Sequence, residues 1–159
     1  MVFTVFVSHS VKDLWLVYLL KSWLESRGIN VYIAEENPEP GKPLPKKIAE
    51  AIDKSDAVLA LLTSDGARSQ WVHQEIGYAI KAGKPVIPVI EEGVEVKGFL
   101  TGVEYISFRR DNPWPAIRHI VSYIEKLKME KEKEEGIATA LSLFILLLAF
   151  GAAITSSRK

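Results

Sequence analysis

Short apolar runs alternate with longer amphipathic stretches along the first 125 residues of the chain. The short runs are rich in β-branched and aromatic residues, and they predict strands at 3–8, 30–34, 57–62, 85–90 and 105–108. The stretches between them repeat apolar residues every three or four positions, and they predict helices at 11–27, 45–54, 68–82 and after residue 113. This alternation predicts an α/β fold with a five-stranded parallel sheet covered by helices on both faces.

In a parallel sheet of this kind, ligands bind beyond the carboxyl ends of the strands, which here means the loops after Ser8, Ala34 and Thr63. In the first loop, Ser10 stands where a helix cap is expected, and His9 is either a solvated residue or part of a site. The second loop, 35–45, contains four prolines and is either a recognition loop or an ordinary connection. Neither loop has the glycine-rich cradle that binds dinucleotides or nucleoside triphosphates.

Two residues on the helix predicted at 68–82 are candidates for chemistry. Trp71 and Glu75 lie four positions apart, so their side chains share one helix face. The indole could form one wall of a pocket while the carboxylate stabilises a developing positive charge. The alternative is a tryptophan in the core and a glutamate on the solvated surface, which is the commoner arrangement.

The C-terminal part of the chain has a different composition. Residues 137–154 carry no charge, and eighteen helical residues rise about 27 Å, close to the thickness of a hydrocarbon core of about 30 Å. We therefore expect one transmembrane helix at 136–155, with a buried core helix as the alternative. A charged helical spacer is expected at 126–135. Its lysines outnumber the basic residues after the span, which places the folded part in the cytoplasm.

Composition excludes several classes of function. Twenty basic and twenty acidic residues cancel, so the chain has no overall basic character that would favour nucleic acid. There is no cysteine, which removes thiol catalysis and cysteine-bound zinc. The three histidines are scattered without the spacing of metal ligands, so no metal site is expected.

Several motifs together resemble the TIR domain family, the Toll/interleukin-1 receptor domains, over residues 1–125. The motifs are Phe6-Val7-Ser8-His9-Ser10, Pro40-Gly41-Lys42, Ile52-Asp53-Lys54-Ser55-Asp56, Ser69-x-Trp71-x-x-x-Glu75 and 83–90. The resemblance implies a flavodoxin-like fold. It also implies one of two functions, because many TIR domains cleave NAD between nicotinamide and ribose, by hydrolysis or cyclisation, whereas others are scaffolds that only self-associate.

In the catalytic members the essential glutamate corresponds to Glu75. Breaking the N-glycosidic bond creates an oxocarbenium-like ribose and a neutral leaving group, so one carboxylate suffices where most glycosidases need two. The resemblance assigns further residues to the binding of NAD, which would be a substrate and not a cofactor. They are Ser8, His9, Ser10, Glu39, Gly41, Lys42 and Trp71.

The sequence therefore predicts a membrane-tethered TIR domain that cleaves NAD on self-association, in defence or signalling. Two alternatives remain open. One is a non-catalytic interaction module, and the other is an enzyme that cleaves or transfers other nucleosides or nucleotides, because related α/β folds also set a glutamate against an anomeric carbon. Arg109-Arg110-Asp111 could bind a phosphate or form an ordinary surface loop.

Overall fold

The computed structural model describes the backbone of residues 2–95 and 98–156, and the side chains of these residues except 99 and 149–156. Two units are distinguished, residues 2–123 and residues 124–159, and each is described by itself.

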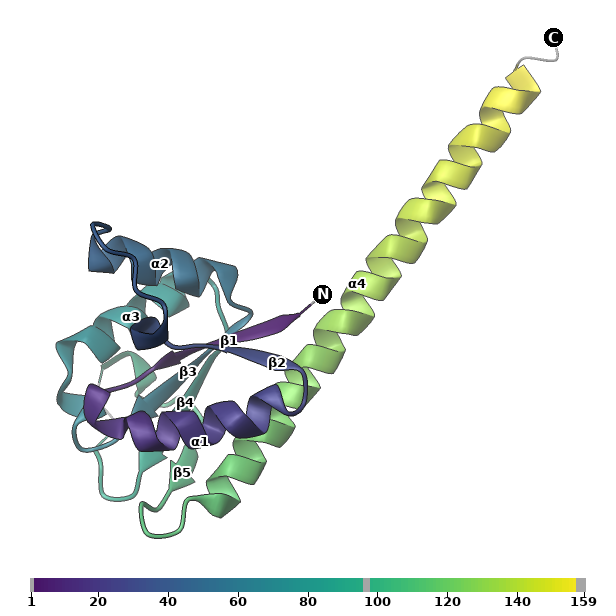
Figure 1. Ribbon diagram of the computed structural model, residues 1–159. Coiled ribbons are helices and arrows are strands. Elements are labelled where there is room, and N and C mark those ends of the chain that lie inside the picture. The colour runs from purple at the N-terminus through teal and green to yellow at the C-terminus, as the bar shows by residue number, and fades with distance from the viewer. Residues whose placement is uncertain (1, 96–97, 157–159) are drawn as a thin grey trace. The chain divides into compact units, whose positions relative to one another are not determined.

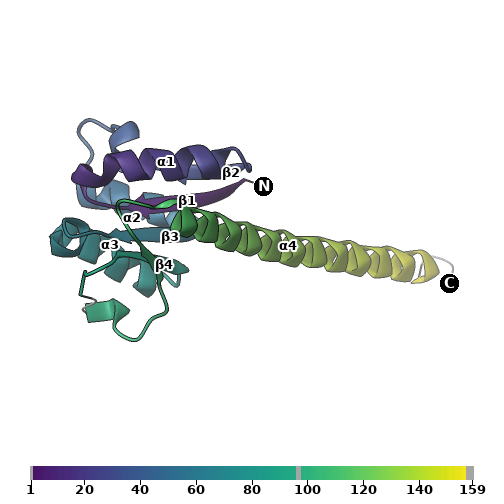
Figure 2. The same ribbon diagram turned by 90° about the horizontal axis from the view of Figure 1, so that it is seen from below.

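The first unit contains five parallel strands in the order β2-β1-β3-β4-β5, which confirms the predicted sheet and is the flavodoxin-like order. The strands are β1 Phe3–Ser8, β2 Ile29–Tyr32, β3 Ala57–Leu62, β4 Val86–Glu91 and β5 Ile106–Phe108. The helices are α1 Leu14–Glu25, α2 Leu44–Lys54, α3 Gln70–Lys81 and α4 Trp114–Ser156, of which only the first ten residues belong to this unit. They cover both faces of the sheet (Figures 1 and 2).

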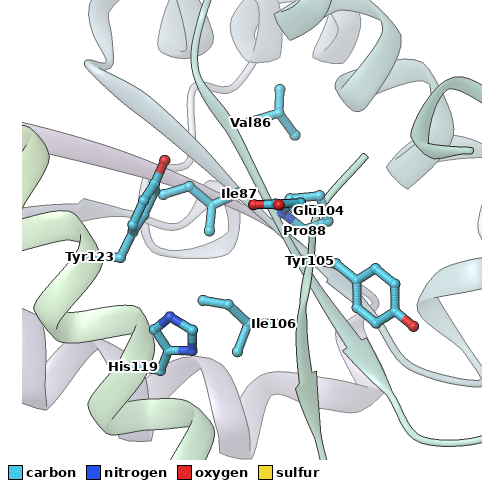
Figure 3. Close-up of a pocket in the computed structure, with 8 residues that line it drawn as sticks. All are labelled: Val86, Ile87, Pro88, Glu104, Tyr105, Ile106, His119 and Tyr123. Carbon is cyan, nitrogen blue, oxygen red and sulfur yellow. The ribbon is translucent and has the colours of Figure 1, made fainter. Parts of the chain in front are cut away.

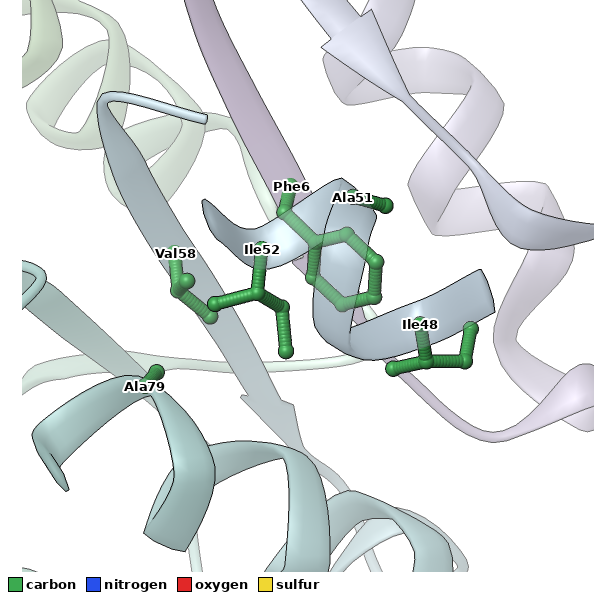
Figure 4. Close-up of a cluster of buried hydrophobic side chains, with 6 residues drawn as sticks. All are labelled: Phe6, Ile48, Ala51, Ile52, Val58 and Ala79. Atoms are coloured by element: carbon green, nitrogen blue, oxygen red, sulfur yellow. The ribbon is translucent and has the colours of Figure 1, made fainter. Parts of the chain in front are cut away.

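Strand periodicity decides which residues face which helices. On one face, Phe6 of β1 and Val58 of β3 pack against Ile48, Ala51 and Ile52 of α2 and Ala79 of α3, as Figure 4 shows. On the opposite face, Val89 of β4 and Phe108 of β5 meet α1 and the start of α4. Because successive side chains of a strand point to opposite faces, Ser8 faces the same side as Phe6, which is the side of α3.

Short 3₁₀ turns replace parts of two predicted elements. The start of the helix predicted at 11–27 is the turn η1, Val11–Asp13, and the end of the strand predicted at 30–34 is the turn η2, Ala34–Glu36. The side-chain amide of Asn37 donates to the Ile33 carbonyl at 2.8 Å, and the buried ammonium of Lys47 donates to the Ala34 carbonyl at 2.7 Å. These contacts hold the chain in a turn where the apolar pattern predicted more strand.

A buried polar network fixes the loop after β3. The Thr63 hydroxyl donates to the carboxylate of Asp13 at 2.6 Å, and the Gly66 backbone N–H donates to the Thr63 oxygen at 2.9 Å. Asp13 is almost fully buried and also meets the Arg110 guanidinium at 3.5 Å. The network joins three loops at the carboxyl edge of the sheet.

In the second unit, the predicted spacer at 126–135 is helical and forms part of α4. Lys126 pairs with Glu130 at 3.8 Å and Lys131 with Glu135 at 3.5 Å, each four residues apart. Among the residues searched, no helix combines the length and the apolar character needed to cross a membrane. The side chains at the end of the predicted span, 149–155, lie outside the described set, so the span at 136–155 stays a prediction.

The close packing at Gly66 gives a test of the fold. A methyl group at this position would lie 2.4 Å from the Leu61 carbonyl oxygen, so Gly66→Ala must displace backbone. We expect a loss of about 1–3 kcal/mol in the free energy of unfolding. All four tryptophans lie in the first unit, so their fluorescence during urea unfolding measures this loss. Gly136→Ala, where a methyl group meets nothing within 4 Å, is the matched control, and an equal effect of the two changes would contradict the described packing.

Candidate functional site

A cavity of about 400 Å³ opens at the carboxyl ends of β1 and β2, in the region predicted from the strand order. It lies between the loop after β1, η2 and the N-terminal parts of α2 and α3. Apolar side chains form much of its wall: Val11, Ala34, Leu44, Ile48 and Trp71. The polar lining residues are His9, Ser10, Glu35, Ser69 and Glu75. A volume of this size is in the range of small-molecule sites.

The start of α3 places Trp71 and Glu75 at this cavity. The Ser69 hydroxyl oxygen accepts the Val72 backbone N–H at 3.4 Å and so caps the helix. The buried stripe of α3 is formed by Val72, Ile76 and Ala79, and Trp71 falls beside it. The indole is therefore 47% exposed, whereas the carboxyl of Glu75 is largely enclosed. The alternative considered in the sequence analysis was a tryptophan in the core and a glutamate on the solvated surface. The structure shows the opposite arrangement.

Glu75 has an unusual environment for a carboxyl group. Its pKa is raised from 4.5 to about 7, mainly by burial and to a smaller extent by the negative charge of Glu35. A hydrogen bond from the Ser8 hydroxyl acts in the opposite direction, because it stabilises the charged form. Ser8 is fully buried at the end of β1. Glu75 is thus a desolvated carboxyl with one hydroxyl donor and no neutralising cation among the residues that line the cavity.

His9 is buried and directed into the site, so it is not a solvated loop residue. Its side chain is only 3% exposed. Nδ1 lies 3.0 Å from the Val7 carbonyl, which can only accept, so Nδ1 carries a proton. Nε2 has no hydrogen-bond partner among the described groups and lies 3.5 Å from a carboxylate oxygen of Glu35.

The structure brings together some of the residues assigned by resemblance and separates others. His9, Ser10, Trp71 and Glu75 line the cavity, and Ser10 also accepts the Lys12 backbone N–H at 3.4 Å. Ser8 does not line it, but its hydroxyl donates to the carboxyl of Glu75. Glu39, Gly41 and Lys42 do not line it. The Lys42 ammonium is instead held by Glu39 at 2.8 Å and Glu50 at 2.6 Å.

Glu35 is a site residue that the sequence did not single out. It lies in η2, beyond the carboxyl end of β2, and the rule that ligands bind beyond the carboxyl ends of strands could have drawn attention to it. The two arginines considered as a phosphate-binding site already form ion pairs with carboxylates. Arg109 binds Asp111 at 2.7 Å, and Arg110 binds Glu91 at 2.8 Å.

A second cavity, at the other side of the fold, is a weaker candidate. It has a volume of about 140 Å³ and lies where β5 leaves the first residues of β4 without a strand partner on that side (Figure 3). Glu104 is its only carboxylate, beside His119, Tyr105 and Tyr123. Its size is too small for a nucleotide. No group of three possible metal ligands occurs among the described residues.

Comparisons with known proteins agree with the fold. The family described as TIR domain matches residues 5–121. The human Toll-like receptors 6 and 1 are each 32% identical over 78 residues, which is 48% of this chain and 10% of theirs. The chain thus matches about a tenth of the length of these curated relatives.

Solved structures show the same architecture. The TIR domain of the Toll-related receptor TRR-2 from Hydra magnipapillata has a TM-score of 0.66 at 20% identity, covering 76% of this chain and 97% of that one. A TIR-STING receptor from C. gigas has a TM-score of 0.64 at 22% identity, with coverages of 76% and 38%. The CMP N-glycosidase BcmB from Clostridium botulinum has a TM-score of 0.51 at 23% identity, with coverages of 79% and 98%.

The raised pKa of Glu75 makes the stability of the protein depend on pH. Between 4.5 and about 7 the folded protein binds more protons than the unfolded chain, so the free energy of unfolding falls as pH rises through this window. One pKa unit corresponds to about 1.4 kcal/mol, so above pH 7 the ionised Glu75 lowers the free energy of unfolding by about 3 kcal/mol. We expect Glu75→Gln to be more stable than the wild type at pH 8 and to lose this advantage near pH 5. Urea unfolding of both proteins at pH 5 and pH 8 measures the difference in their free energies of unfolding. An equal difference at the two pH values would contradict the raised pKa of Glu75.

Proposed function

The chain belongs to the TIR domain family, and we propose that it cleaves NAD at the bond between nicotinamide and ribose when its TIR domains associate. The observation that carries the proposal is the desolvated carboxyl of Glu75 in a cavity beside a half-exposed tryptophan. A carboxyl with a strongly raised pKa in a cleft is the usual mark of a functional site.

The geometry suits N-glycosidic cleavage. As the bond to nicotinamide breaks, positive charge develops on the ribose, and an ionised Glu75 in a poorly solvated site stabilises that charge strongly. Nicotinamide leaves as a neutral molecule, so no second carboxyl is needed to protonate it. The hydrogen bond from Ser8 fixes the carboxylate, and the exposed face of Trp71 offers a surface on which an aromatic ring can stack.

The environment of Glu75 also bears on the alternative of a non-catalytic scaffold. Burying a carboxylate without a cation destabilises the folded protein, and a surface that only mediates association gains nothing from such a group. Proteins keep strained or desolvated groups chiefly where activity requires them. Glu75 therefore favours an enzyme over a scaffold, with self-association as a condition for activity.

A second candidate substrate class is a smaller nucleoside or nucleotide. Cleavage of the N-glycosidic bond in such a substrate would use Glu75 in the same way, at the anomeric carbon. The fold is also similar to that of a CMP N-glycosidase. A substrate panel of NAD and pyrimidine nucleotides, assayed for release of nicotinamide or free base, distinguishes the two classes.

The second unit supports a membrane-anchored effector in defence or signalling. Large apolar side chains are more than half exposed at every position from Leu143 to Leu148. Exposed apolar stretches of this kind mark membrane or protein contacts. We place the TIR domain on the cytoplasmic side, because lysines cluster before the predicted span.

Replacement of Glu75 tests the proposed activity. We expect the full chain to release nicotinamide from NAD at a rate per molecule that rises steeply with protein concentration. Glu75→Gln keeps the shape of the side chain but not its charge, and it should lower the rate by at least about 100-fold. Glu92→Gln is the matched control, because Glu92 is an exposed carboxylate that does not line the cavity. Undiminished release by Glu75→Gln would reject the assignment.

The membrane topology is tested separately. A reporter fused after Lys159 should be active outside the cytoplasm, and a reporter fused before residue 2 should be active inside it. The reverse pattern, or two cytoplasmic signals, would contradict the proposed anchor.

A further inference from the structure

Two hydrogen-bond acceptors face each other at one end of the cavity. Since Nδ1 of His9 donates to the Val7 carbonyl, Nε2 of the neutral ring is an acceptor. The nearest charged group, a carboxylate oxygen of Glu35 at 3.5 Å, is also an acceptor. The imidazole is buried, and Nε2 has no partner among the described groups. Such a pair lacks a hydrogen, which either a proton on Nε2 or a donor group of a ligand supplies.

The position of Glu35 is fixed by the contacts on both sides of it. Before it, the Ala34 carbonyl accepts the Lys47 ammonium at 2.7 Å. After it, Glu36 is bound to Lys21 of α1, and the side chain of Asn37 closes the turn on the Ile33 carbonyl at 2.8 Å. Glu35 is thus held at the cavity, with a carboxylate oxygen 3.5 Å from Nε2 of His9 and its charge close enough to raise the pKa of Glu75.

The chemistry of these groups limits the ligand. Nε2 of His9, the carboxylate of Glu35 and the ionised form of Glu75 all accept hydrogen bonds, and both carboxylates are negatively charged when ionised. A phosphate placed there would be repelled, because no lysine or arginine lines the cavity. A hydroxyl group fits, since its O–H donates to Nε2 of His9 or to a carboxylate. Acceptors in two places call for two neighbouring hydroxyls, as in the cis-diol of ribose.

We propose that His9 and Glu35 form a hydroxyl-binding pair that holds one hydroxyl of the substrate's ribose, while Glu75 holds the other, so that the site selects ribosides over deoxyribosides. This inference rests on the proposed function, because it concerns the same cavity. Removing a hydroxyl leaves a poorly solvated acceptor unpaired, and sites that bind a substrate hydroxyl reject the analogue that lacks it far more strongly than apolar pockets reject a missing methylene.

The test measures binding and does not require turnover. The probe is carbocyclic NAD, which keeps the ribose hydroxyls but has no cleavable glycosidic bond, together with its forms lacking the 2′- or the 3′-hydroxyl of the nicotinamide ribose. Affinities for the full chain are measured by titration calorimetry. In the wild type we expect each deoxy form to bind at least about 10-fold more weakly than its parent.

The variant Glu35→Ala then distinguishes the contributions of the two hydroxyls to affinity. One of the two losses should shrink below about 2-fold in this variant, and the other, which depends on Glu75, should persist. Glu92→Ala removes an exposed carboxylate that does not line the cavity, and it should keep both losses. Two unchanged losses in Glu35→Ala would overturn the inference, as would a wild type that does not bind the parent probe. A chain that shows the expected binding pattern but releases no nicotinamide from NAD would support the hydroxyl-binding pair and reject the proposed cleavage.

Discussion

The site depends on a single constraint, the burial of the Glu75 carboxyl against the hydroxyl of Ser8. Strand periodicity directs Ser8 towards α3, and the cap at Ser69 sets the start of α3 so that Glu75 meets it. The resulting hydrogen bond joins the end of β1 to the first turns of the helix. It stabilises a charge that burial disfavours, so the carboxyl is held in place without being neutralised.

The rest of the carboxyl edge serves to keep this arrangement fixed. The network of Asp13, Thr63 and Gly66 holds the loop that leads into α3. On the other side, Lys47 and Asn37 hold the turn that carries Glu35. Rigid support of this kind is what allows a site to keep unsatisfied groups directed at a ligand. In contrast, Lys42 is bound by two glutamates and stands away from the cavity.

Much of the fold follows from the sequence, because a buried parallel strand such as β3 is apolar throughout and the alternation of elements admits few topologies. The directions of the Ser8 and Glu75 side chains follow from two local periods, 2 for the strand and 3.6 for the helix. Their contact joins residues 67 positions apart and does not follow from these periods. The position of Glu35 was not predictable from the sequence either, because it is set by Lys21 and Lys47, which come from other helices. Similarly, the exposure of Trp71 depends on which stripe of α3 the sheet buries, and the pairing of Arg110 with Glu91 joins residues 19 positions apart.

Titration of the Glu75 carboxyl shows whether it is buried as described. Carbon-13 labelling of the glutamate carboxyls, with Glu75→Gln to identify the signal, gives its pKa in the folded protein. Burial of the carboxyl predicts a pKa of about 7 in the wild type, and a higher pKa in Ser8→Ala, because the hydrogen bond that favours the charged form is lost. A wild-type pKa near 4.5 would show that the carboxyl is solvated and that the site is not built around a buried Glu75.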